Sequence, residues 1–282
     1  MITRRKFITS STAAIAAAVF SPVVFSSSSG RKLDKIGFIS GIIDKELKGD
    51  WKSVLRKTAE FGYTEIETGG FLGESAEGFL SFCKKIEMTL VAGGINFTDP
   101  NDKILKSLDL INSLKMKYAV AYWPWYTGGP FTIADCRKSA DQLNNIGSLC
   151  SEHGLTFCWH NHNKEFIQMD EGLPYDYLMA HTDKDLVKCE MDIYWVLKGG
   201  ADPVKLLKKY SGRYVILHVK DMARGADQDF ECPGSGIIDF PSIFSEAADQ
   251  GIEHYFVERD NVIDGMECLR TSAGYLKNLR FK

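Results

Sequence analysis

The sequence predicts one α/β domain with the fold of a (β/α)8 TIM barrel. From about Lys35, short apolar runs rich in β-branched residues alternate with longer stretches of helical periodicity, as in consecutive βα units. About eight such units follow one another, the number that closes a parallel barrel. No G-x-G-x-x-G follows the first predicted strand, which disfavours a doubly wound dinucleotide-binding sheet.

The individual elements follow from where each pattern begins and ends. The predicted strands are residues 36–40, 64–67, 89–93, 118–122, 155–160, 187–195, 214–221 and 254–258. The predicted helices are residues 51–61, 76–86, 104–114, 133–153, 204–210, 241–249 and 266–279. Gly62, Gly154, Gly212 and Gly251 lie at helix ends, where a left-handed cap favours glycine. No linker interrupts this order, so residues 31–282 are expected to form one barrel domain.

The first 30 residues have the layout of an export signal. Arg4 and Arg5 precede an apolar run at 13–25 and the serine-rich stretch 26–30, as in a twin-arginine signal. A membrane anchor is the alternative, but Ser21 and Pro22 interrupt a run already short for a span of roughly 20 residues. We therefore expect cleavage, a periplasmic location and no stable membrane insertion afterwards.

Charge and cysteine content narrow the classes of partner. The formal net charge is −3 and the pI is about 6.1, so neither nucleic acid nor an anionic membrane is expected as a partner. A small molecule is the better expectation. The 7 cysteines lack a C-x-x-C pair, and their odd number argues against a disulfide framework, so most are expected to be buried thiols.

Several predicted strands place ionisable residues on one face and apolar residues on the other. In a parallel barrel both faces are buried, and alternate residues point into the lumen. The polar positions that share this parity are Glu65, Glu67, His160, His162, Glu190, Asp192, His218, Lys220 and Glu258. Buried carboxylates and imidazoles repel or stay neutral unless a cation holds them. The pattern therefore indicates a divalent-metal site at the mouth of the barrel.

Five ordered motifs make the second half recognisable. They read WHNHNKEF, EMDIYWVLKGGADPVKLL, GRYVILHVKDM, GSGIIDFPSIF and HYFVERDN. Together they closely resemble the sugar phosphate isomerase/epimerase family of xylose isomerase-like TIM barrels, a group that also includes tagatose 3-epimerase-like enzymes and inosose dehydratases. The resemblance runs from roughly Lys35 to the end and is strongest after Leu155.

The resemblance implies a divalent metal, most often Mn²⁺, with Mg²⁺, Co²⁺ and Zn²⁺ as alternatives. Asp192, His218 and Glu258 carry over as three of the ligands. The family has a glutamate at the end of the fifth strand, where this sequence has histidines. Glu165 is expected to be the fourth ligand, and His162 is the competing candidate.

The implied activity is proton abstraction next to a sugar carbonyl, by a metal-dependent sugar isomerase or epimerase. Glu258, His160 and His162 are the candidate bases, and Lys220 or a histidine is the candidate acid. Because histidine replaces the glutamate, a keto-sugar or keto-glycoside lyase or dehydratase is the alternative. A non-catalytic sugar-binding protein is the rival from another class.

The substrate is expected to be a non-phosphorylated sugar or glycoside, since an exported enzyme rarely meets sugar phosphates. Glu67, Trp123, Asn161 and Lys220 are the candidate substrate-binding residues. A homo-oligomer is the only protein partner that the family suggests.

Overall fold

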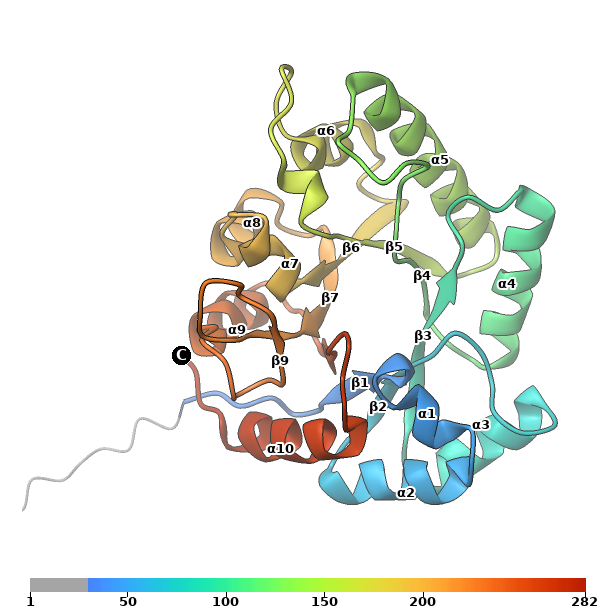
Figure 1. Ribbon diagram of the computed structural model, residues 1–282. Helices are drawn as coiled ribbons and strands as arrows, with labels where there is room; N and C mark the ends of the chain where they lie inside the picture. The colour runs from blue at the N-terminus through green and yellow to red at the C-terminus, as the bar shows by residue number, and fades with distance from the viewer. Residues whose placement is uncertain (1–29) are drawn as a thin grey trace, which may run out of the picture.

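The computed structural model describes residues 30–282, which form a closed barrel of parallel strands surrounded by helices (Figure 1). The expected export signal lies outside these residues, apart from Gly30. The strands, in their order around the barrel, are β1 (Gly37–Ile39), β10 (His254–Val257), β7 (Tyr214–Val219), β6 (Val187–Asp192), β5 (Thr156–His160), β4 (Tyr118–Ala121), β3 (Thr89–Ile95) and β2 (Glu65–Glu67). The predicted fold class is confirmed.

The helices return the chain outside the barrel. They are η1 (Ser40–Ile43), α1 (Asp44–Leu47), α2 (Trp51–Phe61), α3 (Ala76–Lys85), α4 (Asn101–Ser113), α5 (Ile133–Glu152), η2 (Lys164–Phe166), α6 (Pro174–His181), α7 (Ile193–Lys198), α8 (Pro203–Lys209), α9 (Phe240–Asp249) and α10 (Gly265–Asn278). Local caps fix their ends. Thr132 and Asp135 form a reciprocal capping box at the start of α5, and Gly62 ends α2 with φ of 106°. Among residues 30–282, no helix has the length and apolarity that a membrane crossing requires.

The register of the strands brings four of the predicted polar residues to one level, whereas Glu65, at the start of β2, lies near the other end of the barrel and contacts His254 and Lys35. His160 on β5 pairs with Glu190 on β6, and Asp192 pairs with His218 on β7. Deeper in the lumen, an apolar cluster fills the barrel; it includes Val120, Cys158, Ile216 and Phe256. Apolar side chains therefore fill the middle of the lumen, and charged side chains lie at the C-terminal ends of the strands, as the parity of the strands predicts.

Two predicted strands extend two or more residues beyond the observed C-terminal ends. The strand predicted at 187–195 ends at Asp192, because the Asp192 carboxylate accepts a hydrogen bond from the Trp195 N–H and starts α7. The strand predicted at 214–221 ends at Val219. Beyond Lys220 the chain forms a small antiparallel hairpin of β8 (Asp221–Met222) and β9 (Phe230–Glu231).

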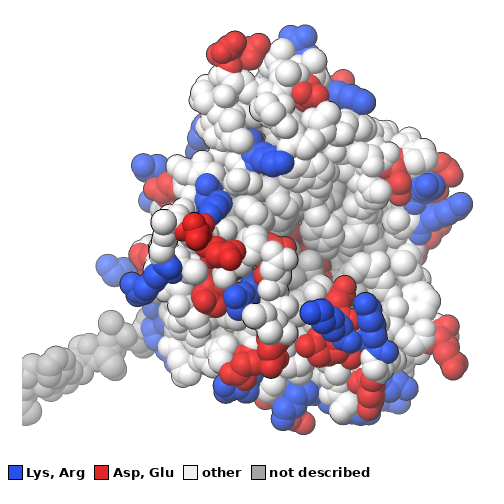
Figure 2. Space-filling view, in the orientation of Figure 1, with Lys and Arg blue, Asp and Glu red and all other residues white. Residues whose placement is uncertain are grey.

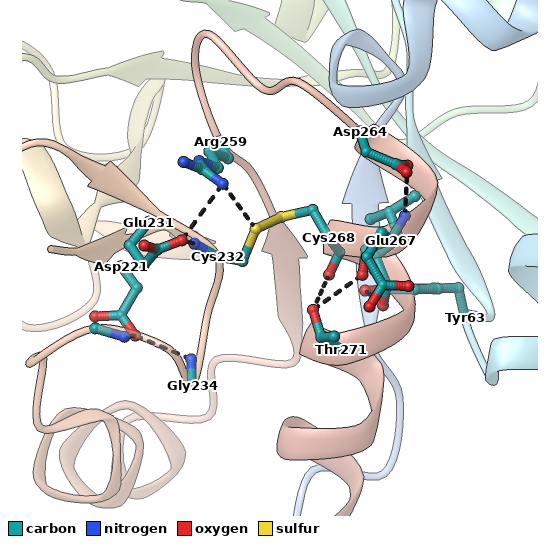
Figure 3. Close-up of a disulfide and its surroundings, with 12 residues drawn as sticks. Tyr63, Asp221, Glu231, Cys232, Gly234, Arg259, Asp264, Glu267, Cys268 and Thr271 are labelled. Atoms are coloured by element: carbon teal, nitrogen blue, oxygen red, sulfur yellow. Dashed lines mark hydrogen bonds and ion pairs between the residues drawn. A yellow bond between two sulfur atoms is a disulfide. The ribbon is translucent and has the colours of Figure 1, made fainter.

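A buried carboxylate organises the base of this hairpin and the turn that follows it. Asp221 accepts hydrogen bonds from the backbone N–H groups of Met222, Gly234, Gly236 and Ile238, at 2.8 to 3.1 Å. Figure 3 shows the contact with Gly234. The residues at the hairpin tip, 224–229, are exposed. The base of the hairpin is thus fixed by one side chain while its tip faces solvent.

One disulfide joins this region to the last helix. Cys232, just after β9, is bonded to Cys268 on α10 (Figure 3). The remaining five cysteines are buried free thiols, as expected. The number of cysteines did not predict the bridge, because an odd total is compatible with a single pair.

Candidate active site and metal centre

Four side chains converge where β5, β6, β7 and β10 end. His160, Asp192, His218 and Glu258 each offer a nitrogen or oxygen atom, and these atoms all lie within 4.8 Å of one another. Glu67, Glu190 and His218 form a second such group, so His218 belongs to both. Figure 2 shows this face of the molecule, hollowed at its centre with charged side chains of both signs around the hollow.

The histidines of the site, His160 and His218, each contact two or more carboxylates. Nδ1 of His160 lies 2.8 Å from Oε1 of Glu190, and its Nε2 lies 3.6 Å from Oδ2 of Asp192. Nε2 of His218 lies 3.0 Å from Glu190 and 3.3 Å from Glu67, and its Nδ1 lies 3.2 Å from Glu258. An Nδ1–H of His160 that donates to Glu190 leaves Nε2 available as a metal ligand.

The carboxylates outnumber the cations that surround them. Burial raises the pKa of Glu190 well above its usual range, and the neighbouring Glu67 adds to that effect. Burial likewise raises the pKa of Asp192 to about 7, although Lys220 opposes it. Burial alone would lower the pKa of His218, but Glu190 and Glu67 hold it well above its ordinary value. The site therefore stabilises additional positive charge.

Lys220 is the fixed cation of this site. Its ammonium lies 3.0 Å from Asp192, 2.7 Å from Glu258 and 2.7 Å from Asp260. Burial would lower its pKa, but these three carboxylates raise it, so Lys220 is charged at neutral pH. Burial would raise the pKa of Glu258, but Lys220 and His218 bring it well below its usual range. Glu258 is therefore an ionised carboxylate at the mouth.

The residues fit a divalent metal. Oε2 of Glu190 is buried and accepts no hydrogen bond from the described residues. Oδ2 of Asp192 is also buried, and it faces the Lys220 ammonium at 3.0 Å and Nε2 of His160 at 3.6 Å. Two imidazoles and two carboxylates form a donor set that suits Mn²⁺, Co²⁺ or Zn²⁺. His160, Asp192, His218 and Glu258 are the residues that would hold the ion.

The structure places the expected fourth ligand elsewhere. Glu165 is fully buried in η2, and its Oε1 accepts a hydrogen bond from the His162 N–H at 3.1 Å. Within the described chain, neither group of candidate ligands includes Glu165 or His162. Burial raises the pKa of Glu165 to about 8 and lowers that of His162 to about 4. His160 takes the fourth position of the group, and Glu165 as a ligand stays a prediction.

The predicted substrate-binding residues occupy different positions. The Tyr122 hydroxyl donates a hydrogen bond to Glu67 at 2.6 Å. Trp123 lies at the mouth, with its ring 5.0 Å from that of His162. Asn161 is buried, and its amide exchanges two hydrogen bonds with the backbone of Asp192. Asn161 thus ties the end of β5 to the end of β6.

Sequence reasoning did not assign a role to three residues of the site. Asp260 was not singled out, Glu190 was noted only for its parity, and Tyr122 was not expected to contact Glu67. Asp260 stands two residues after Glu258, so its position in the motif VERD was the available signal. The contact between Tyr122 and Glu67 joins residues 55 positions apart, and the local sequence pattern does not predict it.

Residues 55–278 match the family described as xylose isomerase-like TIM barrel, and the chain belongs to this family. Inosose dehydratase of Clostridium perfringens is 31% identical over 158 residues, which are 49% of this chain and 52% of that protein. Inosose dehydratase of Geobacillus kaustophilus is 26% identical over 230 residues, 68% of this chain and 74% of that protein. The chain thus spans about half the length of the first relative.

Solved structures share the fold. A sugar phosphate isomerase/epimerase from Parabacteroides distasonis aligns with a TM-score of 0.75 at 24% identity, over 89% of this chain and 96% of that one. The IolI protein with a bound zinc atom aligns with a TM-score of 0.68 at 17% identity, over 85% and 95%. The 3-keto-D-glucoside 4-epimerase of E. coli aligns with a TM-score of 0.65 at 16% identity, over 87% and 99%.

Proposed function

We propose that this protein is a divalent-metal-dependent enzyme that removes a proton from the carbon next to the carbonyl of a non-phosphorylated sugar, as an isomerase or epimerase. The observation that carries the proposal is the convergence of His160, Asp192, His218 and Glu258 at the ends of four strands. The relatives named as inosose dehydratases, the epimerase-like neighbours and the zinc bound to the IolI protein support it.

The chain supplies the groups for proton transfer around a bound sugar. A divalent metal at this site would polarise the carbonyl and so acidify the adjacent C–H bond. Glu258 is ionised, its side chain is 16% exposed, and it can accept that proton from a sugar in the mouth. His162 is neutral, and its buried Nδ1 has no partner among the described residues. We therefore assign the proton acceptance to Glu258 or to His162.

A second reaction, elimination by a keto-sugar lyase or dehydratase, has its own support. The charged Lys220 lies 2.7 Å from Glu258, so a proton donor stands beside the proposed base. In this reaction the proton leaves the carbon next to the carbonyl, the C–O bond on the following carbon breaks, and the departing oxygen takes a proton. The products are a keto-sugar with a new C=C bond next to its carbonyl and a molecule of water or alcohol. The inosose dehydratase relatives favour this candidate.

The test is hydrogen exchange in D₂O. Protein stripped with EDTA and reloaded with Mn²⁺, Mg²⁺, Co²⁺ or Zn²⁺ is incubated with free ketoses and 3-keto-glycosides, and NMR follows deuterium at the carbon next to the carbonyl. Metal-dependent deuteration with a rearranged or inverted sugar supports the isomerase or epimerase. A released alcohol or a dehydrated sugar supports the lyase. Sugar binding without exchange, unchanged in Asp192→Ala and His218→Ala, would replace the proposal with a non-catalytic sugar-binding protein.

We also propose that the protein is exported and works in the periplasm. The layout of residues 1–30 and the disulfide, which persists in oxidising compartments, support this location. Replacing both Arg4 and Arg5 with lysine is expected to retain the protein in the cytoplasm. Fractionation that finds processed wild-type protein only in the cytoplasm would contradict the proposal.

A further inference from the structure

A cavity of about 390 Å³ adjoins the candidate active site. It lies between the turn that follows β1 and the loop that joins β10 to α10, which are drawn side by side in blue and red in Figure 1. Its lining residues are Ile39, Gly41, Ile42, Asp44, Lys45, Glu46, Glu258, Arg259, Asp260, Asn261, Val262, Ile263 and Gly265. This volume falls in the range of small-molecule sites.

Glu258 connects the cavity to the candidate metal centre. Its carboxylate lies 3.2 Å from His218 and 2.7 Å from Lys220, and Glu258 also lines the cavity. Asp260 likewise contacts Lys220 and lines the cavity. A ring that reacts beside Glu258 therefore has space next to it for a second unit.

The lining has the chemistry of a sugar site. Asp44, Lys45, Glu46 and Asn261 form no side-chain hydrogen bond or ion pair with another residue in the part of the chain that the structure describes, so their polar atoms are available to hydroxyl groups. Beside them lie the apolar side chains of Ile39, Ile42, Val262 and Ile263. Sugar rings present both hydroxyl edges and C–H faces, and this surface offers partners for both.

The walls of the cavity are held in place. A Cβ added to Gly265 would lie 2.0 Å from the carbonyl oxygen of Ile42, so the two walls meet with no room for a side chain. Arg259 lies 3.3 Å from Glu231 and 3.3 Å from the sulfur of Cys232, whose disulfide reaches α10 (Figure 3). A site formed in advance loses less entropy when a ligand binds.

We propose that this cavity binds a neutral sugar unit attached to the reacting ring, so that the substrate is a disaccharide or another glycoside. This inference rests on the proposed function. Four carboxylates line the cavity against Lys45 and Arg259. The excess negative charge disfavours a phosphorylated or uronic unit in this position.

The first experiment compares sugars that share a reacting ring. Protein loaded with Mn²⁺ is assayed on D-fructose against isomaltulose and on 3-keto-glucose against 3-keto-trehalose, where the second member adds a neutral glucosyl unit. We expect kcat/KM to be at least about tenfold higher for the disaccharide, as a few additional hydrogen bonds provide. An equal or lower value overturns the inference and leaves the proposed function standing. No hydrogen exchange with any of the four sugars contradicts the proposed function itself.

Two variants test whether the preference for the disaccharide arises in the cavity. Gly41 lines the cavity, its φ is not left-handed, and an added Cβ meets no atom within 4 Å, so Gly41→Phe fills the space without backbone strain. We expect the ratio of kcat/KM for the disaccharide over the monosaccharide to fall about tenfold or more. Gly274 on α10 is equally unobstructed and lies outside the cavity, so Gly274→Phe should keep the wild-type ratio.

Asn261 offers a polar test with its own control. It has φ of 51°, which glycine adopts freely, so Asn261→Gly removes the amide without straining the backbone. We expect the same ratio to fall severalfold through a higher KM for the disaccharide. Lys115→Gly, at another left-handed position with φ of 58°, is the control. Unchanged ratios in both Gly41→Phe and Asn261→Gly would overturn the inference.

Discussion

At the scale of single residues, His160 and Glu165 distinguish two versions of the metal site. His160 lies among the candidate ligands, whereas Glu165 accepts a backbone hydrogen bond. We expect His160→Ala to weaken Mn²⁺ binding by at least about 100-fold, because a ligand is lost, and Glu165→Gln to change it less than about threefold. Calorimetric titration of metal-free protein measures both. The reverse order would make Glu165 the fourth ligand, as the family resemblance implies.

Glu165 also predicts a dependence of stability on pH. Its pKa is raised by burial to about 8, while the unfolded chain has a value near 4.3. Between about pH 4.5 and pH 8 the folded protein keeps a proton that the unfolded chain releases, so stability falls as pH rises. Glu165→Gln keeps the acceptor for the His162 N–H and should be more stable than wild type at pH 8 by on the order of 3 kcal/mol.

Urea unfolding at pH 5, 6.5 and 8 measures this difference. The exposed Glu171 in the same segment supplies the control, since Glu171→Gln should follow the wild-type pH dependence. Parallel profiles for wild type and Glu165→Gln would show that Glu165 does not hold the proton.

Strand parity predicted that Asp192, His218 and Glu258 share the lumen face, because the face on which a strand residue lies follows from its position in the sequence. For the fourth ligand the sequence left Glu165 and His162 as the alternatives, and parity could not decide between them. The chain leaves β5 after His160 and turns into η2, and beyond a strand end no periodic rule says which way a side chain points. The pairing of His160 with Glu190 on β6, which brings His160 among the candidate ligands, is visible only in the folded barrel.

At the scale of elements, the disulfide braces the hairpin against α10. It closes a loop of 36 residues, which by loop entropy stabilises the fold by about 3 to 4 kcal/mol. We expect reduction to lower Tm by on the order of 10 °C, measured by calorimetry with and without reductant. The other five cysteines are already thiols, so the reductant acts on this bond alone. The double variant Cys232→Ser, Cys268→Ser should match the reduced protein, and an unchanged Tm in both would contradict the bracing role.

Elements with a clear period were predictable to within a few residues, including the short α8, whereas α6 and α7 were not predicted. The helix predicted at 133–153 is α5, Ile133–Glu152, because its apolar period and its capping residue agree. The six-residue α7 was hidden in the apolar run IYWVLK, which reads equally well as a strand. Its start depends on Asp192 acting as a cap, a role that the sequence pattern does not distinguish from a lumen carboxylate.

At the scale of the whole molecule, metal binding should stabilise the fold. The buried carboxylates Glu190 and Asp192 have raised pKa values because burial disfavours their charged forms. A bound cation would stabilise those charged forms and so raise the free energy of unfolding of the whole barrel. At a free metal concentration of 100 times Kd, the gain is about 2.7 kcal/mol, which raises Tm by roughly 5 to 10 °C. Thermal scans with and without Mn²⁺ measure the shift. Asp192→Asn combined with His218→Gln should abolish it, and an equal shift in that variant would place the metal elsewhere.

The closed barrel itself followed from counting βα units, since eight parallel strands with helical connections have one common way to close. The position of the cavity beside Glu258 did not follow from the sequence. Its walls come from residues 39–46 and 258–265, segments at opposite ends of the barrel domain that become neighbours only when β1 pairs with β10.

The hairpin of β8 and β9 is a segment of this protein in which the sequence can change. Asp221 holds its base through four backbone contacts, directly after Lys220, while residues 224–229 at the tip are exposed. The backbone carbonyls of Asp227 and Gln228 accept hydrogen bonds from Lys198 and Tyr194 on α7, so side chains at the tip can be substituted while these contacts stay in place. For protein engineering, the side chains of this tip are the positions to randomise when a new substrate preference is sought, because Asp221 and backbone atoms make the contacts that fix the hairpin.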